Sequence, residues 1–229
     1  YYSERGSRFN QLSRYWLAES YYRNDQYDDA IGVFTDLYNT SALYGQQESY
    51  LIPYNIAYCH YKKGDYNSAL RWFDEYLKEA ETEFRKEALV RRADCFFIAK
   101  KYKEACAAYD LVLDDYFNAN DIYPYYQAAL SYGLARKMPE KIELLSNVMG
   151  ASPDAEFYPE ALFELGRSYV AEENDEKAFE CFTKLSEVVK DSTFVARAYV
   201  EMGSLARNQS QYNEALGYYK TVVEEMPLS

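Results

Sequence analysis

A sixfold internal repeat constrains the fold of this chain more than any other feature of its sequence. Each copy contains a small or aliphatic residue, called the anchor here. In most copies an aromatic residue follows the anchor four places later. The anchors are Ala30, Ala69, Ala105, Ile142, Ala178 and Ala215, so successive anchors stand 39, 36, 37, 36 and 37 residues apart. A period this regular predicts a stacked array, because every unit must present the same face to its neighbours.

Each repeat is predicted to be a pair of helices. Residues 165–169 (Leu-Gly-Arg-Ser-Tyr) place large, small and aromatic side chains at helical spacing, and residues 56–60 do the same. The small residue lets two helices approach closely. Short polar turns such as 63–65 and 173–175 end one helix and begin the next, and Pro139 begins a second helix in the fourth copy. No segment alternates like a strand, so the chain is predicted to be all-helical.

These residues resemble the tetratricopeptide repeat (TPR) family of bacterial type, in six degenerate copies. The fifth copy carries Leu162, Leu165, Gly166, Tyr169, Ala178 and Phe182, and the last carries Tyr199, Met202, Gly203, Tyr212, Ala215, Tyr219 and Pro227. The resemblance implies an all-α, right-handed superhelical solenoid of antiparallel helix pairs. The period is longer than the roughly 34 residues typical of the family, and the fourth copy needs an insertion near 137–138.

The resemblance covers nearly the whole chain. We expect residues 1–10 to be the end of a preceding helix or an N-terminal extension, and 11–229 to form a single solenoid. Its six hairpins are expected at about 11–44, 50–83, 86–119, 122–156, 159–192 and 196–229. Because no polar capping helix follows the last copy, the chain is expected to be a segment of a longer protein or to associate through its ends.

Charge and composition narrow the class of partner. The chain carries 37 Asp and Glu against 25 Lys and Arg, for a net charge of −12, and this disfavours nucleic acid and anionic membranes. Its apolar stretches are too short to insert into a bilayer. The 27 tyrosines are the unusual part of the composition, since they supply apolar area that also carries a hydroxyl group.

Residues that carry chemistry are few, so no enzyme activity, metal or cofactor is expected. The four cysteines form no CxxC pair and are interpreted as thiols packed between helices, although Cys59 and Cys95 occupy equivalent positions where a disulfide is a minor alternative. His60 stands where other copies have an aromatic residue. It is interpreted as a packed, hydrogen-bonded side chain rather than a general base, because no nucleophile accompanies it.

Function is therefore expected in the surface that the array forms. In the TPR family the first helix of each pair lines a concave groove, and the resemblance carries the family's groove positions onto this chain. The candidate peptide-binding residues are Tyr15, Glu19, Tyr22, Arg23, Tyr54, Tyr58, Tyr61, Lys62, Asp94, Phe97, Tyr126, Arg167 and Arg207. The alternative for Tyr15, Tyr54 and Tyr58 is that they only pack against neighbouring helices.

The leading hypothesis is a non-catalytic scaffold that binds a protein or peptide segment in this tyrosine-rich groove. Family relatives that bind acidic chaperone tails use Lys and Asn at groove positions where this chain has Tyr15 and Glu19, so such a tail is not the expected ligand. The alternative hypothesis is a structural or regulatory segment of a larger bacterial envelope-assembly or sensor protein, in which the array positions other domains or self-associates through its uncapped ends. Similarity of residues 158–169 to envelope proteins slightly favours a periplasmic location over a cytoplasmic one, and the compartment, partner and oligomeric state stay open.

Overall fold

The computed structural model describes residues 2–78, 84–116, 118 and 120–226, with side chains from Phe9 onward. The described residues form helices joined by turns, without a β-strand. The helices are α1 (Tyr2–Arg23), α2 (Tyr27–Asn39), α3 (Gln47–Lys62), α4 (Tyr66–Tyr76), α5 (Arg85–Ile98), α6 (Tyr102–Asp115), α7 (Ile122–Leu134), α8 (Met138–Ser146), η1 (Asn147–Gly150), α9 (Tyr158–Ala171), α10 (Asp175–Val188), α11 (Ser192–Asn208) and α12 (Tyr212–Glu225). The all-helical prediction is confirmed.

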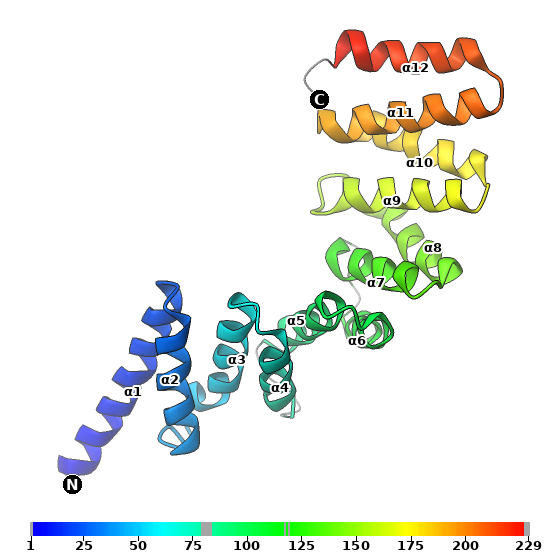
Figure 1. Cartoon of the computed structure of the whole chain (residues 1–229). Helices are drawn as coiled ribbons and strands as arrows, with labels where there is room; N and C mark the ends of the chain where they lie inside the picture. Colours follow the sequence, from blue (N-terminus) through cyan, green and yellow to red (C-terminus); the bar gives the residue numbers. More distant parts are fainter. Residues whose placement is uncertain (1, 79–83, 117, 119, 227–229) are drawn as a thin grey trace. The chain divides into compact units, whose positions relative to one another are not determined.

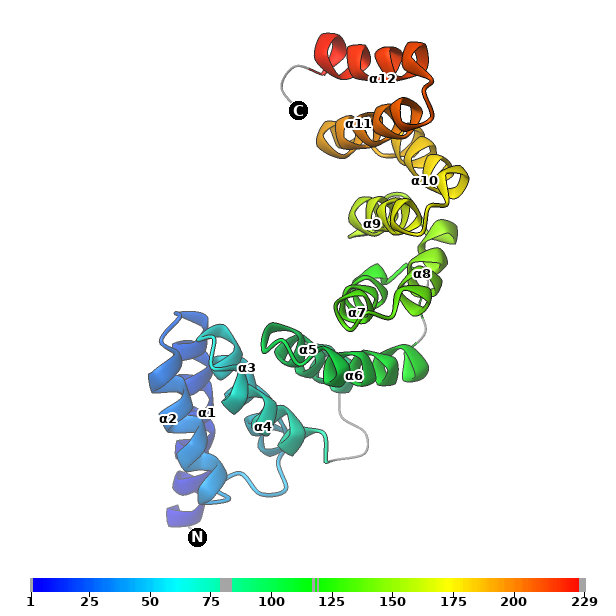
Figure 2. The same cartoon turned by 45° about the vertical axis from the view of Figure 1, so that its right-hand side comes forward.

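The chain divides into two compact units, residues 1–112 and 113–229, and the division falls within the last turn of α6. In the first unit, α1 packs on α2, α3 packs on α4, and the first helices α1 and α3 also contact each other. In the second unit, α7 packs on α8, α9 on α10 and α11 on α12, with contacts from α9 to both α7 and α11. Figures 1 and 2 show these helix pairs from two directions. Within each unit, the first helix of one pair therefore lies beside the first helix of a neighbouring pair.

The repeat anchors form the centres of the helix pairs. Five of them, Ala30, Ala69, Ala105, Ala178 and Ala215, are buried, and the weaker anchor Ile142 is partly buried. The aromatic residues four places after the first, second, third and fifth anchors are fully buried as well. The regular period in the sequence therefore corresponds to a regular packing position, at which a small side chain on the second helix admits the first.

The turn inside each hairpin has one geometry throughout. A single residue takes a left-handed φ between 55° and 79° at Asp25, Gly64, Lys100, Arg136, Glu173 and Ser210. The residue after each of them donates its N–H to a carbonyl five positions earlier, such as Asp65 to His60 and Asn174 to Tyr169. This bond pattern is the Schellman motif, which satisfies carbonyls at the end of a helix. The polar turns predicted from the sequence are thus confirmed as helix C-caps.

Two glycines of the repeat motif lie at close helix contacts in the second unit. A Cβ atom at Gly166 would lie 2.6 Å from Cε1 of Phe182, and one at Gly203 would lie 2.7 Å from Cε1 of Tyr219. No side chain larger than hydrogen fits there without displacing an aromatic ring. This confirms the prediction that a small residue in the first helix permits close approach of the second.

Each predicted hairpin range overlaps one helix pair, with η1 added in the fourth, but α3 begins at Gln47 and α11 at Ser192, before the predicted starts at 50 and 196. From Tyr2 to residue 10 the chain is continuous with α1, so this stretch lengthens the first helix rather than ending a separate one. Pro139 lies in the first turn of α8, as predicted. The ends of the second, third and sixth ranges, together with Pro227, lie outside the described residues. A single continuous solenoid over 11–229 stays a prediction.

Candidate functional site

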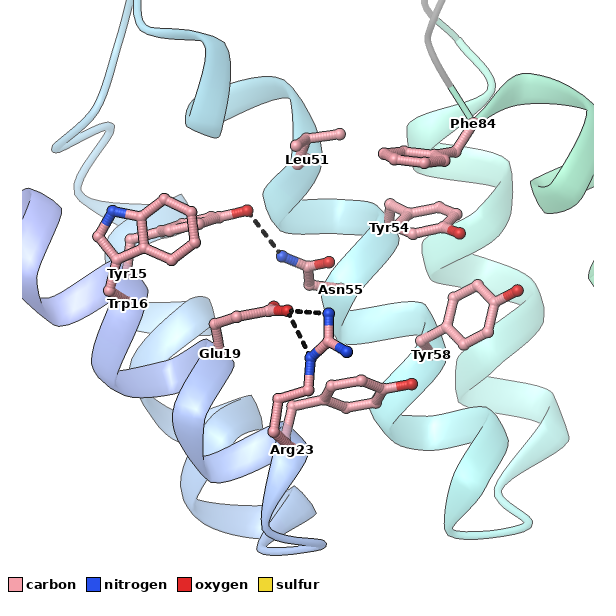
Figure 3. Close-up of a pocket in the computed structure, with 10 residues that line it drawn as sticks. Tyr15, Trp16, Glu19, Arg23, Leu51, Tyr54, Asn55, Tyr58 and Phe84 are labelled. Atoms are coloured by element: carbon pink, nitrogen blue, oxygen red, sulfur yellow. Dashed lines mark hydrogen bonds and ion pairs between the residues drawn. The ribbon is translucent and has the colours of Figure 1, made fainter.

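The first unit has a pocket between α1 and α3, the first helices of its first two helix pairs. The pocket has a volume of about 400 Å³. Figure 3 shows α1 contributing one wall, α3 the other, and Phe84 closing one end. The pocket is lined by Tyr15, Trp16, Glu19, Tyr22, Arg23, Leu51, Tyr54, Asn55, Tyr58 and Phe84. Its volume lies within the range of about 300–1,000 Å³ that is typical of ligand pockets.

The α1 wall combines aromatic and charged side chains. Tyr15 is 4% exposed, and its hydroxyl accepts a hydrogen bond of 3.0 Å from the Asn55 amide of α3. One turn further along α1, the Glu19 carboxylate accepts from Arg23 at 3.1–3.2 Å. The Glu19 side chain is 21% exposed and that of Arg23 is 75% exposed, so the carboxylate is the charge held within the pocket.

The α3 wall is a cluster of aromatic rings. Tyr54 stacks on Phe84 with ring centroids 5.0 Å apart, and it also contacts Tyr58 at 4.8 Å and Tyr76 at 5.2 Å. Tyr58 in turn packs edge-on against the buried ring of Phe73. These contacts fix the ring orientations before any ligand arrives, which lowers the entropy lost on binding.

A hydrogen-bonded network of charged groups supports this wall from α5. The Tyr58 hydroxyl donates to Glu87 at 2.5 Å, and the Arg91 guanidinium bonds both Glu87, at 2.9 Å, and Asp94, at 2.6 Å. The buried Asp94 also accepts a hydrogen bond from Tyr109 of α6. Burial disfavours the charge of Arg91, but the two carboxylates reverse this effect and raise its pKa. The network therefore ties α3, α5 and α6 together behind the pocket.

Six of the sequence-predicted groove residues line this pocket: Tyr15, Glu19, Tyr22, Arg23, Tyr54 and Tyr58. Four others lie elsewhere in the first unit. Tyr61 is half-buried between Tyr58 and Tyr66, Lys62 is exposed at the end of α3, and Phe97 packs edge-on against Tyr102. Asp94 is 4% exposed, and its carboxylate is engaged by Arg91 and Tyr109, so its place is in the core rather than on a groove surface.

The remaining three predicted residues belong to the second unit. Tyr126 stacks on Phe157, and Arg207 is exposed in the last turn of α11. Arg167 lines a shallower pocket of about 340 Å³ on α9 and α11, where the guanidinium of Arg197 lies 4.0 Å from the ring centre of Phe163. The second unit therefore has a first-helix surface of its own, with exposed cations instead of a tyrosine cluster.

Four residues that line the first unit's pocket are absent from the candidates named from the sequence: Trp16, Leu51, Asn55 and Phe84. Trp16 follows a predicted groove position directly, and its 55% exposure sets it apart from core aromatics. Phe84 precedes α5 and lies outside every first helix, so the repeat pattern has no position for it. Only the tertiary structure brings its ring onto Tyr54.

Burial raises the pKa of the pocket phenols. It raises the pKa of Tyr15, Tyr54 and the neighbouring Tyr61 to about 12, and burial together with the hydrogen bond to Glu87 raises that of Tyr58. These groups stay neutral hydrogen-bonding phenols across the physiological pH range.

The free energy of unfolding of the first unit is expected to fall as pH rises from 10 to 12. An unfolded tyrosine loses its proton near pH 10, whereas these folded phenols keep theirs up to about pH 12. The contribution of the protonated phenols to the free energy of unfolding is therefore complete below pH 10 and is lost as the pH rises toward 12. Both tryptophans lie in the first unit, so urea unfolding followed by their fluorescence isolates it. Tyr54→Phe should show a shallower fall, and an equal fall in variant and wild type would contradict the assignment.

The structure offers little other chemistry. Among the described residues no cluster of three or more His, Cys, Asp or Glu side chains is arranged to hold a metal ion. All four cysteines are buried and none forms a disulfide, which confirms their interpretation as packed thiols. His60 is partly buried with Nδ1 at 3.2 Å from Asp65, and burial lowers its pKa. Within the same part of the chain no helix has the length and apolar character to cross a membrane.

The fold and this site define a class: an all-α helical-repeat protein with a ligand-sized pocket on the first helices of its pairs. Comparison with known families then narrows the class. Sequence profiles of the tetratricopeptide repeat family match residues 17–84, 54–126 and 160–192. The chain belongs to the tetratricopeptide repeat family, whose repeat domains bind protein or peptide partners, and it is a protein-interaction scaffold of that type.

Solved structures with the same fold are similar at low sequence identity. The C-terminal part of a TPR repeat-containing protein from Cytophaga hutchinsonii has a TM-score of 0.72 at 20% identity, over 92% of this chain and 78% of that one. MamA from Desulfovibrio magneticus has a TM-score of 0.61 at 20% identity, over 78% and 94%. YrrB, described as a TPR protein with an unusual peptide-binding site, has a TM-score of 0.62 at 16% identity, over 81% and 89%. Comparison with curated proteins gives no match.

Proposed function

We propose that this chain is a non-catalytic scaffold that binds an extended or helical protein segment in the aromatic pocket between α1 and α3. The observation that carries the proposal is the pocket itself, where six aromatic residues and a partly buried carboxylate meet around an open volume of about 400 Å³. Aromatic side chains with polar ends supply large contact area at little entropic cost, which is why they dominate binding surfaces. Neither nucleic acid nor a membrane is part of this proposal.

The tyrosines of the pocket also pack against their neighbours, and the proposal assigns them both roles. Tyr15 is largely buried and fixes α1 to α3 through Asn55, so it acts chiefly as a support. Tyr54 and Tyr58 are half-buried and keep part of each ring on the pocket surface. Trp16 is 55% exposed and contacts Tyr15 through one edge, so most of its ring is free to contact a ligand.

The test is selection of binders from a display library of short random peptides against the whole chain. Trp16→Ala combined with Tyr54→Ala is expected to weaken the selected peptides at least tenfold, since such central aromatic contacts contribute roughly 2 kcal/mol or more each. Tyr44→Ala is the matched control, because Tyr44 is 89% exposed and lies outside the pocket. Fluorescence anisotropy gives the affinities. Unchanged binding by the folded double variant would reject the proposal.

A second candidate function is structural: self-association through the last helix. Exposed apolar side chains recur along α12 at Tyr212, Leu216 and Val223, with exposures of 67%, 52% and 73%. Spacings of four and seven residues place them along one side of the helix. If this face joins copies of the chain, sedimentation coefficients should rise with concentration, and Leu216→Lys with Val223→Lys should abolish the rise. A concentration-independent monomer would exclude it.

A further inference from the structure

The charge inside the aromatic pocket indicates the chemistry of its ligand. Of the residues that line it, Glu19 and Arg23 are the charged ones, and they form an ion pair within α1. An ion pair this exposed on its arginine side contributes little to stability, so the arginine is easily displaced into water. Figure 3 shows the carboxylate between the two walls, at the level of Asn55. The fixed charge that a ligand meets is therefore negative.

The surroundings of the pocket are acidic as well. Glu19 and Glu48 add to the rise that burial causes in the pKa of Tyr15, and Glu87 adds to the corresponding rise for Tyr54. Arg91, whose guanidinium lies 3.4 Å from the Tyr58 hydroxyl, is already bound by Glu87 and Asp94. The chain as a whole carries a net charge of −12, which attracts basic ligands over a longer range.

The aromatic walls are suited to a cation next to an apolar group. The faces of tyrosine rings attract guanidinium and ammonium groups, and Tyr22, Tyr54 and Tyr58 line the same pocket as Glu19. Trp16, Leu51 and Phe84 also line this pocket and add apolar surface that would contact a bulky aliphatic or aromatic side chain. The second unit contains the same kind of contact internally, with Arg197 held over the rings of Phe163 and Phe194.

We propose that the pocket recognises a partner segment in which a basic side chain, arginine by preference, stands close to a bulky apolar residue. The basic group takes the place of Arg23 at the Glu19 carboxylate, and its stem lies along the tyrosine rings. Arginine is preferred over lysine because its planar guanidinium both stacks on rings and pairs with a carboxylate through two hydrogen bonds. The apolar residue contacts the apolar surface that Trp16, Leu51 and Phe84 contribute to the pocket. This inference rests on the proposed function and specifies its ligand.

The test uses the peptides selected from the random library. Peptides that bind wild type should be enriched in arginine or lysine within a few residues of a bulky apolar residue. For one such peptide, replacing its arginine with citrulline keeps the shape and removes the charge, and this should weaken binding to wild type about tenfold. Glu19→Gln should weaken the arginine peptide about equally and should make the citrulline substitution nearly neutral.

Two further variants sharpen the result. Arg23→Gln should tighten binding of the arginine peptide a few fold, because it removes the internal competitor, whereas a pocket that binds anions would lose affinity. Glu75→Gln is the matched control: Glu75 is 32% exposed, pairs with the exposed Lys78 in the turn after α4, and lies outside the pocket. It should leave binding unchanged.

The outcomes separate the inference from the function on which it rests. Selected peptides that show no basic enrichment, or that bind Glu19→Gln as well as wild type, would overturn the inference while leaving the pocket as a binding site. Enrichment of acidic residues together with weaker binding by Arg23→Gln would replace it with an anion site. Failure to select any peptide that depends on Trp16 and Tyr54 would overturn the proposed function and the inference together.

Discussion

Replacing Arg91 with methionine is expected to lower the free energy of unfolding of the first unit by about 3–5 kcal/mol, the cost typical of removing one partner from a buried ion pair. Methionine keeps the apolar stem but leaves the carboxylate of Asp94 without its cation. Asp94 is 4% exposed, so water cannot replace the guanidinium. Urea unfolding followed by tryptophan fluorescence measures the change in this unit alone.

Arg92→Met is the matched control for this prediction. Arg92 neighbours Arg91, its side chain is 24% exposed against 26%, and its guanidinium lies 2.6 Å from Asp74. Asp74 is 54% exposed, however, so its carboxylate stays solvated when the arginine is removed. The expected loss is about 1 kcal/mol or less. Equal losses for the two variants would contradict the special role given to the buried Asp94.

Gly166→Ala is expected to destabilise the second unit by about 1–3 kcal/mol, the usual cost of forcing an extra methyl group into a packed core. The new Cβ would lie 2.6 Å from the ring of Phe182, which is fully buried and has no free space into which to move. Alanine favours helix over glycine by about 1 kcal/mol, so the steric cost must exceed this gain for the loss to appear. Urea unfolding followed by far-ultraviolet circular dichroism measures it, since both tryptophans lie in the first unit.

Gly217→Ala is expected to have the opposite effect on the stability of the same unit. Gly217 lies within α12, and a Cβ atom there would meet nothing within 4 Å. The substitution should therefore stabilise the unit by about 0.5–1 kcal/mol through helix propensity alone. If Gly166→Ala also stabilised the protein, α9 and α10 would not pack as closely as the structure shows.

Much of the candidate site could be expected from the sequence because the repeat gives each position a structural role. Tyr15, Glu19, Tyr54 and Tyr58 stand at equivalent places in successive first helices, and they do line one pocket. Asp94 stands at the place equivalent to Glu19 and Tyr58 but is buried, because Arg91 and Tyr109 draw its carboxylate into the core. Periodicity assigns a face of a helix, and it cannot tell whether a charged side chain on that face finds a partner inside.

The architecture is predictable from the sequence: helices in pairs, their turns, and the small residues at which they meet. These follow from local periods and short-range contacts that recur about every 37 residues. Which side chains contact one another, and which of them line a common pocket, is known only from the tertiary structure. It placed Phe84 on Tyr54, held Glu19 deeper than Arg23, and opened a pocket between α1 and α3. Those relations join residues tens of positions apart, and they depend on how side chains from different helices pack, which no repeat period encodes.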